Sequence, residues 1–127
     1  MLVDHVKAKA WLMPGGHVDD GEDPRVTVVR ELQEELRIGP PFHPSLGDAP
    51  LFLTVTQTRG EHSHTDVTMW FVFAADRDQE ITPDPAEFSQ VKWFGLDDSS
   101  WAADQFDPGM ARFVAKLSTA LKRVSTG

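Results

Sequence analysis

Three acidic residues in one short segment have the spacing that divalent-metal chemistry requires. Glu31, Glu34 and Glu35 lie one, three and four residues apart, so in a helix they share one face. Like charges at this spacing repel one another, and a hard cation such as Mg²⁺, which binds carboxylate and phosphate oxygens, would reverse that penalty. Arg30 precedes Glu34 by four residues and is expected to pair with it. The alternative is a solvated acidic face without further function.

A helix must position these acids, and the sequence marks both of its ends. Asp23 is predicted as the N-cap and Pro24 as the first helical residue. The helix must end before the stretch 39–41, which is Gly-Pro-Pro. Four apolar residues at helical spacing are expected to face the core: Val28, Val29, Leu32 and Leu36. The acids are displaced from that apolar side of the helix and are therefore available to a ligand.

The rest of the chain predicts strands around this helix and a second helix near the end. Strands are expected over residues 1–6, 51–58, 66–75 and 91–94, and residues 11–16 are expected to be a strand that enters a tight loop. A hairpin connection is expected at 61–65 and a polar loop at 76–89. Asp107-Pro108 predicts the start of the second helix, whose apolar residues are Phe113, Val114, Leu117, Leu121 and Val124. This order predicts an α/β (α+β) fold with helices packed against a mixed sheet.

The overall composition restricts the class of protein. A length of 127 residues predicts a single domain over residues 1–127. We find no signal peptide and no apolar run near the roughly 20 residues of a membrane span, so we expect a soluble cytoplasmic protein that binds no membrane. The chain has no cysteine, which excludes thiolate metal sites. A net charge of -8 argues against nucleic acid as a partner, but metal-holding acids still allow an anionic small molecule.

The acids belong to a longer pattern that resembles the Nudix box. This box reads G, five of any residue, E, seven of any, REU, any, EE, any, GU, where U is aliphatic. Eight of its nine positions match in this sequence: Gly16, Glu22, Arg30, Glu31, Leu32, Glu34, Glu35 and Ile38. Agreement at so many fixed offsets favours the metal-binding interpretation over a solvated acidic face.

The ninth position departs from the box, because Arg37 stands where the pattern has glycine. That glycine normally ends the helix in a left-handed conformation. An arginine there either costs about 1 kcal/mol or shifts the cap toward Gly39. The departure affects the end of the helix and removes no metal-binding side chain.

The resemblance to the Nudix family implies both a fold and a reaction. The fold is an α/β/α sandwich with a mixed sheet, a loop-helix-loop formed by the box, and a C-terminal helix. The reaction is hydrolysis of a diphosphate linkage in a nucleoside di- or triphosphate or a nucleoside diphosphate derivative, with Mg²⁺ (or Mn²⁺) as cofactor. Water attacks phosphorus and a nucleoside monophosphate is released, which requires charge neutralisation and an activated nucleophile. A small-molecule nucleotide would be the partner.

The same resemblance implies roles for individual residues. The metal ligands would be the box acids and one backbone carbonyl: Glu22, Glu31, Glu34, Glu35 and Gly15. Glu31 would be a further ligand or the base that activates water. Glu22 would brace the loop and Arg30 would orient the acids. Family members often place another carboxylate before a late strand, and Glu87 occupies such a place; its alternative is a solvated loop acid.

Several residues outside the box have two interpretations. His5 and Lys7 lie where related proteins contact phosphate, or at an exposed strand end. Three residues have the spacing that would place them on one face of a strand: His62, His64 and Asp66. For these residues a polar turn is favoured over a metal cluster. Three tryptophans lie in apolar stretches: Trp11, Trp70 and Trp93. For at least two of them, packing in the core is favoured over stacking on a base.

The approach to the box is short, with 15 residues before Gly16. Related domains usually have an additional first strand there. Either that strand is missing because the start was assigned too late, or another element fills the sheet edge. An uncovered edge would favour a homodimer.

Three functions compete. The leading hypothesis is a Nudix-type pyrophosphohydrolase, and the alternative is a catalytically silent, nucleotide-binding Nudix-like module. The retained acids argue against the silent module, and a purely structural domain leaves the box unexplained. Downstream of the box there is neither the tyrosine of the diadenosine polyphosphate type nor a proline at the spacing of the ADP-ribose type. These absences favour nucleoside triphosphates as substrates.

Overall fold

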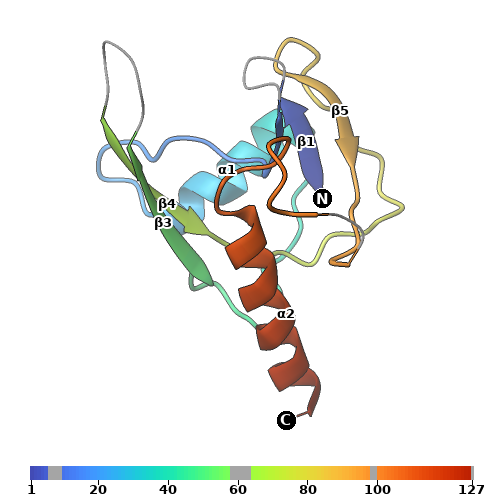
Figure 1. Cartoon of the computed structure of the whole chain (residues 1–127). Coiled ribbons are helices and arrows are strands. Elements are labelled where there is room, and N and C mark those ends of the chain that lie inside the picture. Colours follow the sequence, from blue (N-terminus) through green and yellow to red (C-terminus); the bar gives the residue numbers. More distant parts are fainter. Residues whose placement is uncertain (6–9, 58–63, 98–99, 127) are drawn as a thin grey trace.

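In the part of the chain that the structure describes, five strands and two helices follow one another (Figure 1). The structure is a computed structural model that describes residues 1–5, 10–57, 64–97 and 100–126. Its elements are β1 (Leu2–His5), β2 (Ala10–Leu12), α1 (Pro24–Leu36), β3 (Phe52–Gln57), β4 (Thr65–Trp70), β5 (Phe88–Lys92) and α2 (Met110–Thr126). The predicted α+β class and the C-terminal helix are confirmed. Neither helix, within the described residues, has the length and apolar character to cross a membrane.

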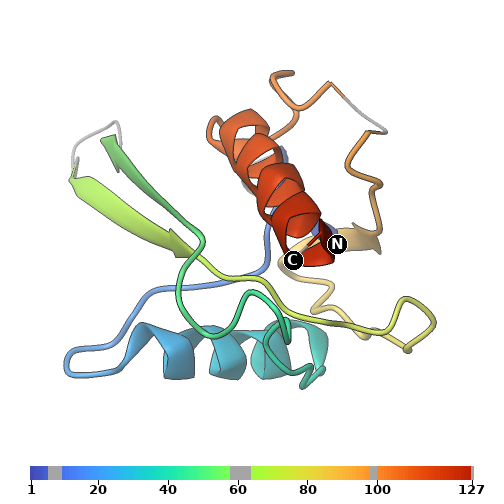
Figure 2. The same ribbon diagram turned by 90° about the horizontal axis from the view of Figure 1, so that it is seen from below.

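The strands form two antiparallel groups. β1 lies between β2 and β5 in a three-stranded sheet, and β3 pairs with β4 in a separate hairpin. Figure 2 shows α1 and α2 on opposite sides of the segment that joins β4 to β5, with the hairpin beside both helices. Parallel pairing, expected within a mixed sheet, is present as a bridge between Trp11 and Phe106. Because the Trp11 amide donates to the Gln105 carbonyl at 2.7 Å, the segment before α2 covers the outer edge of β2.

Two predicted strand boundaries are wrong. The strand expected over 66–75 ends at Trp70, because the chain beyond it pairs with the segment around Phe42 instead of β3. The Ala74 amide donates to the Pro41 carbonyl at 2.9 Å, and the Phe42 and Phe73 rings stack at 4.5 Å. The strand expected over 91–94 spans Phe88–Lys92 and therefore begins inside the predicted loop.

The early start of β5 follows from burial of Phe88. This side chain packs with Leu32 and Leu36 of α1 and with Ile38, in a buried cluster that attaches the helix to β5. The backbone of Phe88 also pairs with His5 of β1. Burial and pairing together place Phe88 in the sheet rather than in a loop.

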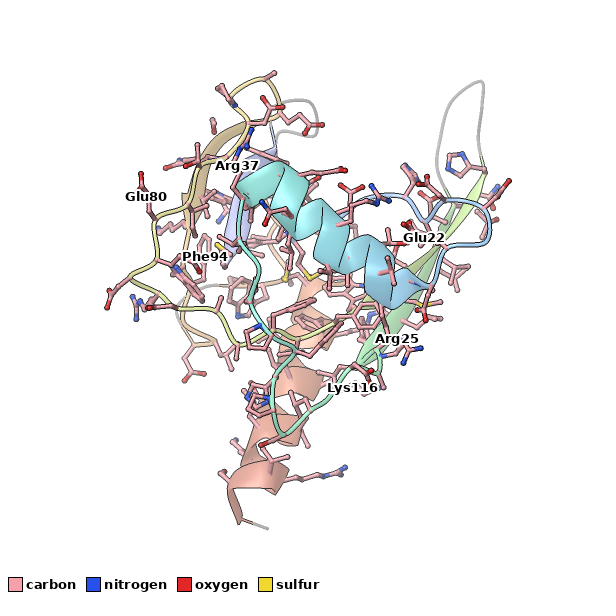
Figure 3. The ribbon with its side chains drawn as sticks, turned by 180° about the vertical axis from the view of Figure 1, so that it is seen from behind. Glu22, Arg25, Arg37, Glu80, Phe94 and Lys116 are labelled. Atoms are coloured by element: carbon pink, nitrogen blue, oxygen red, sulfur yellow. The ribbon has the colours of Figure 1, made fainter. Side chains whose placement is uncertain are left out.

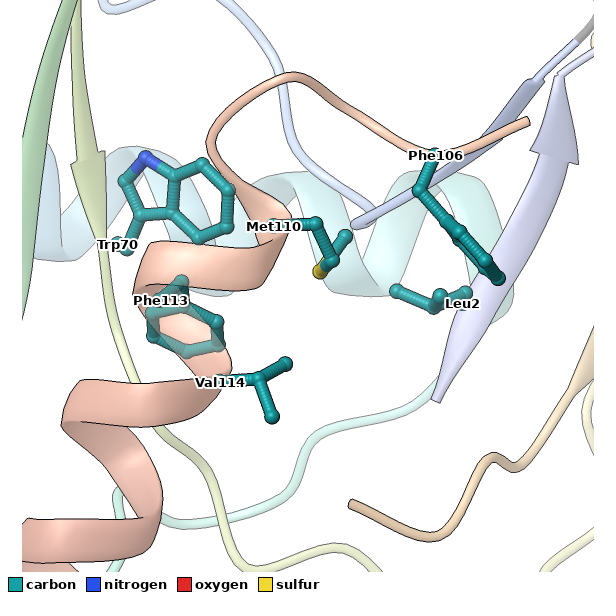
Figure 4. Close-up of a cluster of buried hydrophobic side chains, with 6 residues drawn as sticks. All are labelled: Leu2, Trp70, Phe106, Met110, Phe113 and Val114. Carbon is teal, nitrogen blue, oxygen red and sulfur yellow. The ribbon is translucent and has the colours of Figure 1, made fainter. Parts of the chain in front are cut away.

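A second buried cluster joins α2 to both strand groups (Figure 4). Its members are Leu2, Trp70, Phe106, Met110, Phe113 and Val114. The Trp70 indole N–H donates to the Thr54 hydroxyl at 3.1 Å, which satisfies the one polar atom of a fully buried ring. Trp11 packs against the same cluster. Core packing is thereby confirmed for Trp70 and Trp11.

Both predicted ends of α1 are found. Asp23 is the N-cap, and its carboxylate accepts from the Arg25 amide at 2.9 Å. Arg37 ends the helix in the left-handed conformation, with φ 56° and ψ 43°, and its amide donates to the Gln33 carbonyl at 3.0 Å. The helix therefore ends at Arg37 and its cap does not move to Gly39. Of the two predicted alternatives, the structure has the one in which Arg37 is strained.

One residue of the predicted apolar side of α1 is misplaced. Val29 is 42% exposed, whereas Thr27 is 2% exposed and occupies a buried position on the helix. Leu32 and Leu36 are buried as predicted. The exchange arises because the Thr27 hydroxyl has a hydrogen-bond partner, so its burial carries no desolvation penalty for an unmet polar group.

Candidate active site

One guanidinium group holds most of the acids of the box. Arg30 forms ion pairs with Glu22 at 2.9 Å, Glu31 at 3.1 Å, Glu34 at 3.4 Å and Asp19 at 3.5 Å. We call these five residues the Arg30 cluster. The hydrogen bonds from Arg30, followed by one from the Thr27 hydroxyl, lower the pKa of Glu22 to about 2. The predicted ion pair between Arg30 and Glu34 is present, and it is one of the four ion pairs that Arg30 forms in the described part of the chain.

A tight turn before α1 brings Glu22 to Arg30. The Glu22 amide donates to the Asp19 carbonyl at 2.9 Å, and Gly21 has φ 77°, which residues with a side chain rarely adopt. The Asp23 cap then starts the helix directly after Glu22. Figure 3 shows Glu22 at the beginning of α1 and Arg37 at its far end.

Glu35 has different surroundings from Glu22. Its carboxylate accepts from the Gly15 amide at 3.1 Å. Burial raises the pKa of Glu35 to about 7, and the neighbouring charges of Glu31, Glu87 and Glu34 act in the same direction, against the hydrogen bond from Gly15. This part of the site therefore holds more negative charge than the protein itself neutralises.

Gly16, the first position of the box, lies directly against Glu31. A side chain at residue 16 would collide with the Glu31 carboxylate, which occupies the space where its Cβ would be. The glycine therefore permits close approach of the loop to α1. The loop and the helix acids form one structural unit for this reason.

A cleft of about 460 Å³ opens beside this contact. It is lined by Gly15, Gly16, His17, Asp19, Arg30, Glu31, Glu35 and Glu87. The structure thus brings Glu87, from the loop before β5, together with two acids of the box. Glu22 and Glu34 lie outside this lining, and the Glu34 side chain is 58% exposed.

A larger cavity of about 740 Å³ adjoins the cleft. The two share Gly15, Gly16 and His17, so the glycine loop forms their common wall. The cavity extends between α1, β4 and α2, and aromatic and aliphatic side chains such as those of Met69 and Trp93 contribute to its walls. The arrangement offers an acidic cleft beside a mostly apolar cavity.

The other predicted site residues are not gathered here. The backbone of His5 lies in β1, while its side chain, Lys7 and His62 lie outside what the structure describes. His64 contacts Asp66 at 2.8 Å on the β3–β4 hairpin. Over the described ranges, no three His, Asp or Glu side chains converge closely enough to hold one metal ion.

Besides His17, which lines the cleft, two residues of this site were not predicted. Asp19 reaches Arg30 because the turn at Gly21 folds back, and the sequence Asp-Asp-Gly indicates a turn without indicating its partner. Thr27 donates to Glu22 at 2.6 Å, although a threonine inside a helix gives no sequence signal of a binding role.

Comparison with known proteins identifies the family. The family model of the NUDIX domain matches residues 2–117. An RNA pyrophosphohydrolase of Roseobacter denitrificans is 34% identical over 95 residues, which are 66% of this chain and 59% of that protein. The 8-oxo-dGTP diphosphatase of Escherichia coli is 34% identical over 104 residues, which are 82% of this chain and 70% of that protein.

Solved structures agree in fold. The crystal structure of a MutT NUDIX hydrolase from Burkholderia pseudomallei superposes with a TM-score of 0.70 at 22% identity, over 91% of this chain and 85% of that one. The chain spans about three fifths of the length of the first curated relatives that it matches. The match of the family model to nearly the whole sequence shows that the chain belongs to the Nudix family.

Proposed function

We propose that the protein is a divalent-metal-dependent pyrophosphohydrolase that cleaves a diphosphate linkage in a nucleotide. The observation that supports this most directly is the cleft beside the glycine loop, which Glu31, Glu35 and Glu87 line. Phosphate groups and carboxylates repel each other, so a cleft of this charge accepts a diphosphate when cations lie between them.

The donor atoms of the cleft fit Mg²⁺ or Mn²⁺. Besides His17, the lining has the carboxylates of Asp19, Glu31, Glu35 and Glu87, whose oxygens hard cations prefer over nitrogen or sulfur. The raised pKa of Glu35 supports the same assignment, because a bound cation would offset the burial and the repulsion from neighbouring acids that hold the proton there. Glu31 and Glu35 would hold the ion from the cleft side, with Glu22, Glu34 and the Gly15 carbonyl as the further predicted ligands.

The chain's own groups would orient the reaction. A bound divalent ion polarises the phosphate and lowers the pKa of a coordinated water. Glu87 or Glu31 would accept the proton of the attacking water, since both line the cleft. Arg30 would keep Glu31 and Glu34 in place through its ion pairs. The release of a nucleoside monophosphate then follows from attack on phosphorus.

The adjoining cavity is our candidate for the nucleoside. Its mostly apolar walls suit a base, and the shared glycine loop would let the base lie in the cavity while the diphosphate lies in the cleft. Nucleoside triphosphates are the first substrates to test, and the names of the relatives add RNA with a 5′ pyrophosphate and 8-oxo-dGTP. Phosphate contacts by His5 and Lys7, the homodimer and the cytoplasmic location stay predictions.

A substrate panel with and without metal tests this function. Nucleoside triphosphates, 8-oxo-dGTP and 5′-triphosphorylated RNA are incubated with Mg²⁺ or Mn²⁺, and nucleotide products are separated by chromatography. We expect metal-dependent release from at least one substrate, and loss of that release in Glu35→Gln. Glu80→Gln is the matched control, because Glu80 is an exposed acid of the loop before β5. Nucleotide binding without release from any substrate would support the silent module instead.

A further inference from the structure

Thr27 occupies none of the defined positions of the Nudix box, yet it contacts one of the box acids. Its hydroxyl lies 2.6 Å from Glu22 Oε1, and the residue is 2% exposed. The hydroxyl also lies 3.3 Å from the Asp23 carbonyl. A hydroxyl donates one hydrogen, and the shorter distance together with the charge of the carboxylate favours Glu22 as the acceptor.

The two oxygens of Glu22 connect Thr27 to Arg30. Oε1 accepts from the Thr27 hydroxyl and, at 2.9 Å, from Arg30 Nη2, while Oε2 accepts from Arg30 Nε at 3.3 Å. Nε and Nη2 are thereby fixed on one carboxylate. Because the guanidinium is planar, this contact also fixes the direction of Nη1, which donates to Glu31 at 3.1 Å and to Glu34 at 3.4 Å.

We propose that Thr27 is a positioning residue for metal binding. Its buried hydroxyl holds the Glu22 carboxylate in one orientation, Glu22 orients Arg30, and Arg30 holds Glu31 and Glu34 where they meet the ion. The identity of the metal ligands rests on the proposed function. The contact between Thr27 and Glu22 is a property of the metal-free protein and can be tested by itself.

The test compares one variant that lacks the Thr27 hydroxyl with one that keeps it. Thr27→Val keeps the shape of the side chain and removes the donor, whereas Thr27→Ser keeps the donor. Mn²⁺ binding is measured by calorimetry without nucleotide, and thermal melts confirm that each variant is folded. We expect about tenfold weaker Mn²⁺ binding in Thr27→Val, the scale of losing a group that orients a metal ligand. Binding in Thr27→Ser should stay within about twofold of the unmodified protein.

A matched control separates this role from a general effect on helices. The Thr119 hydroxyl in α2 donates to the Ala115 carbonyl at 3.1 Å, four residues earlier, as Thr27 could do with Asp23. Thr119→Val removes such a contact far from the box and should leave Mn²⁺ binding unchanged. Equal losses in Thr119→Val and Thr27→Val, or in Thr27→Ser and Thr27→Val, would overturn the proposal.

A double-mutant cycle tests whether Thr27 acts through Glu22. In a Glu22→Ala background, Thr27→Val should weaken Mn²⁺ binding no further, because the acceptor that Thr27 orients is already absent. In the metal-free protein, the Arg30 Nε–H signal in NMR should exchange with water faster in Thr27→Val. An unchanged Arg30 signal and unchanged Mn²⁺ binding would contradict this inference alone. Intact Mn²⁺ binding without hydrolysis of any substrate would contradict the proposed function alone.

Discussion

Glu22 and Glu35 are acids of the same box, but the protein treats their charges in opposite ways. Glu22 lies against Arg30, and its pKa is lowered to about 2. Glu35 is partly buried among other acids, and its pKa is raised to about 7. The Glu22 charge is therefore paired with a cation of the chain itself, whereas Glu35 lies in a cleft with negative charge in excess. The contrast leads us to expect that the proposed cation matters more for Glu35 than for Glu22.

Removal of the cleft charge should have the largest effect on activity. Glu35→Gln is expected to lower kcat/KM by about 10²–10³-fold, the scale of losing one electrostatic stabiliser of the transition state. Steady-state kinetics on the best substrate of the panel measure this, with Glu80→Gln as the control. A loss below about threefold would mean that the excess charge of the cleft does not serve catalysis.

Removal of the Glu22 charge should lower the activity less than removal of the Glu35 charge. Glu22→Gln is expected to lower kcat/KM by about 10–100-fold, because the orientation of Arg30 is impaired while Glu31 and Glu35 remain in the cleft. The same kinetic assay measures the ratio of the two losses. If Glu22→Gln proves as damaging as Glu35→Gln, then the site depends equally on both acids and the proposed difference between them is wrong.

The two acids should also give opposite responses of stability to pH. For Glu35 the folded state holds a proton that the unfolded state has lost, so stability falls as pH rises from about 4.5 to about 7. In EDTA, Glu35→Gln should therefore melt above the unmodified protein by a margin that grows across this window and then stays constant. Added Mg²⁺ should narrow the margin, because it stabilises the ionised carboxylate. A margin independent of pH would exclude the raised pKa.

The stability contributed by Glu22 should change with pH in the opposite direction. Its ionised form is favoured in the folded state, so its contribution is present above about pH 4.5 and is lost as the pH falls toward about 2. Glu22→Gln should accordingly destabilise the protein at neutral pH, and the difference in melting temperature should shrink on acidification. Melting curves of both variants between pH 3 and 8, on the order of one per pH unit, would reveal the contrast.

The smallest effect is expected at Arg37, beyond both acids. Arg37 has the left-handed conformation that glycine adopts without steric strain. Arg37→Gly should stabilise the protein by about 1 kcal/mol, which corresponds to a rise in melting temperature of roughly 4 °C for a chain of this size. Its kcat/KM should be unchanged. A gain in activity would show that the helix end also influences the site.

The features that could be predicted from the sequence are those that the residues of one short segment determine. The N-cap at Asp23, the left-handed strain at Arg37 and the gathering of acids on α1 follow from spacing and backbone preferences within one segment. Glu87 was placed correctly near the box, because the cleft includes it. Its role as a base stays a prediction.

Features that depend on contacts between distant segments could not be predicted from the sequence. β4 ends at Trp70 because residues around Phe42 compete for pairing with the chain beyond it. The exchange of Val29 for Thr27 on the buried side of α1 depends on a partner five residues before Thr27, in the preceding loop. The contrasting pKa values of two identical side chains depend on neighbours from the loop, from α1 and from the segment before β5.

Arg37 has a consequence for how the family can diverge. The helix ends at the same residue with arginine as the pattern expects with glycine, because other contacts hold the backbone there. The glycine is thus a preference of conformational energy rather than a requirement for ending the helix at this residue. Where a lineage tolerates a penalty of about 1 kcal/mol, that position is free to drift, and searches that demand glycine will overlook chains with intact acids.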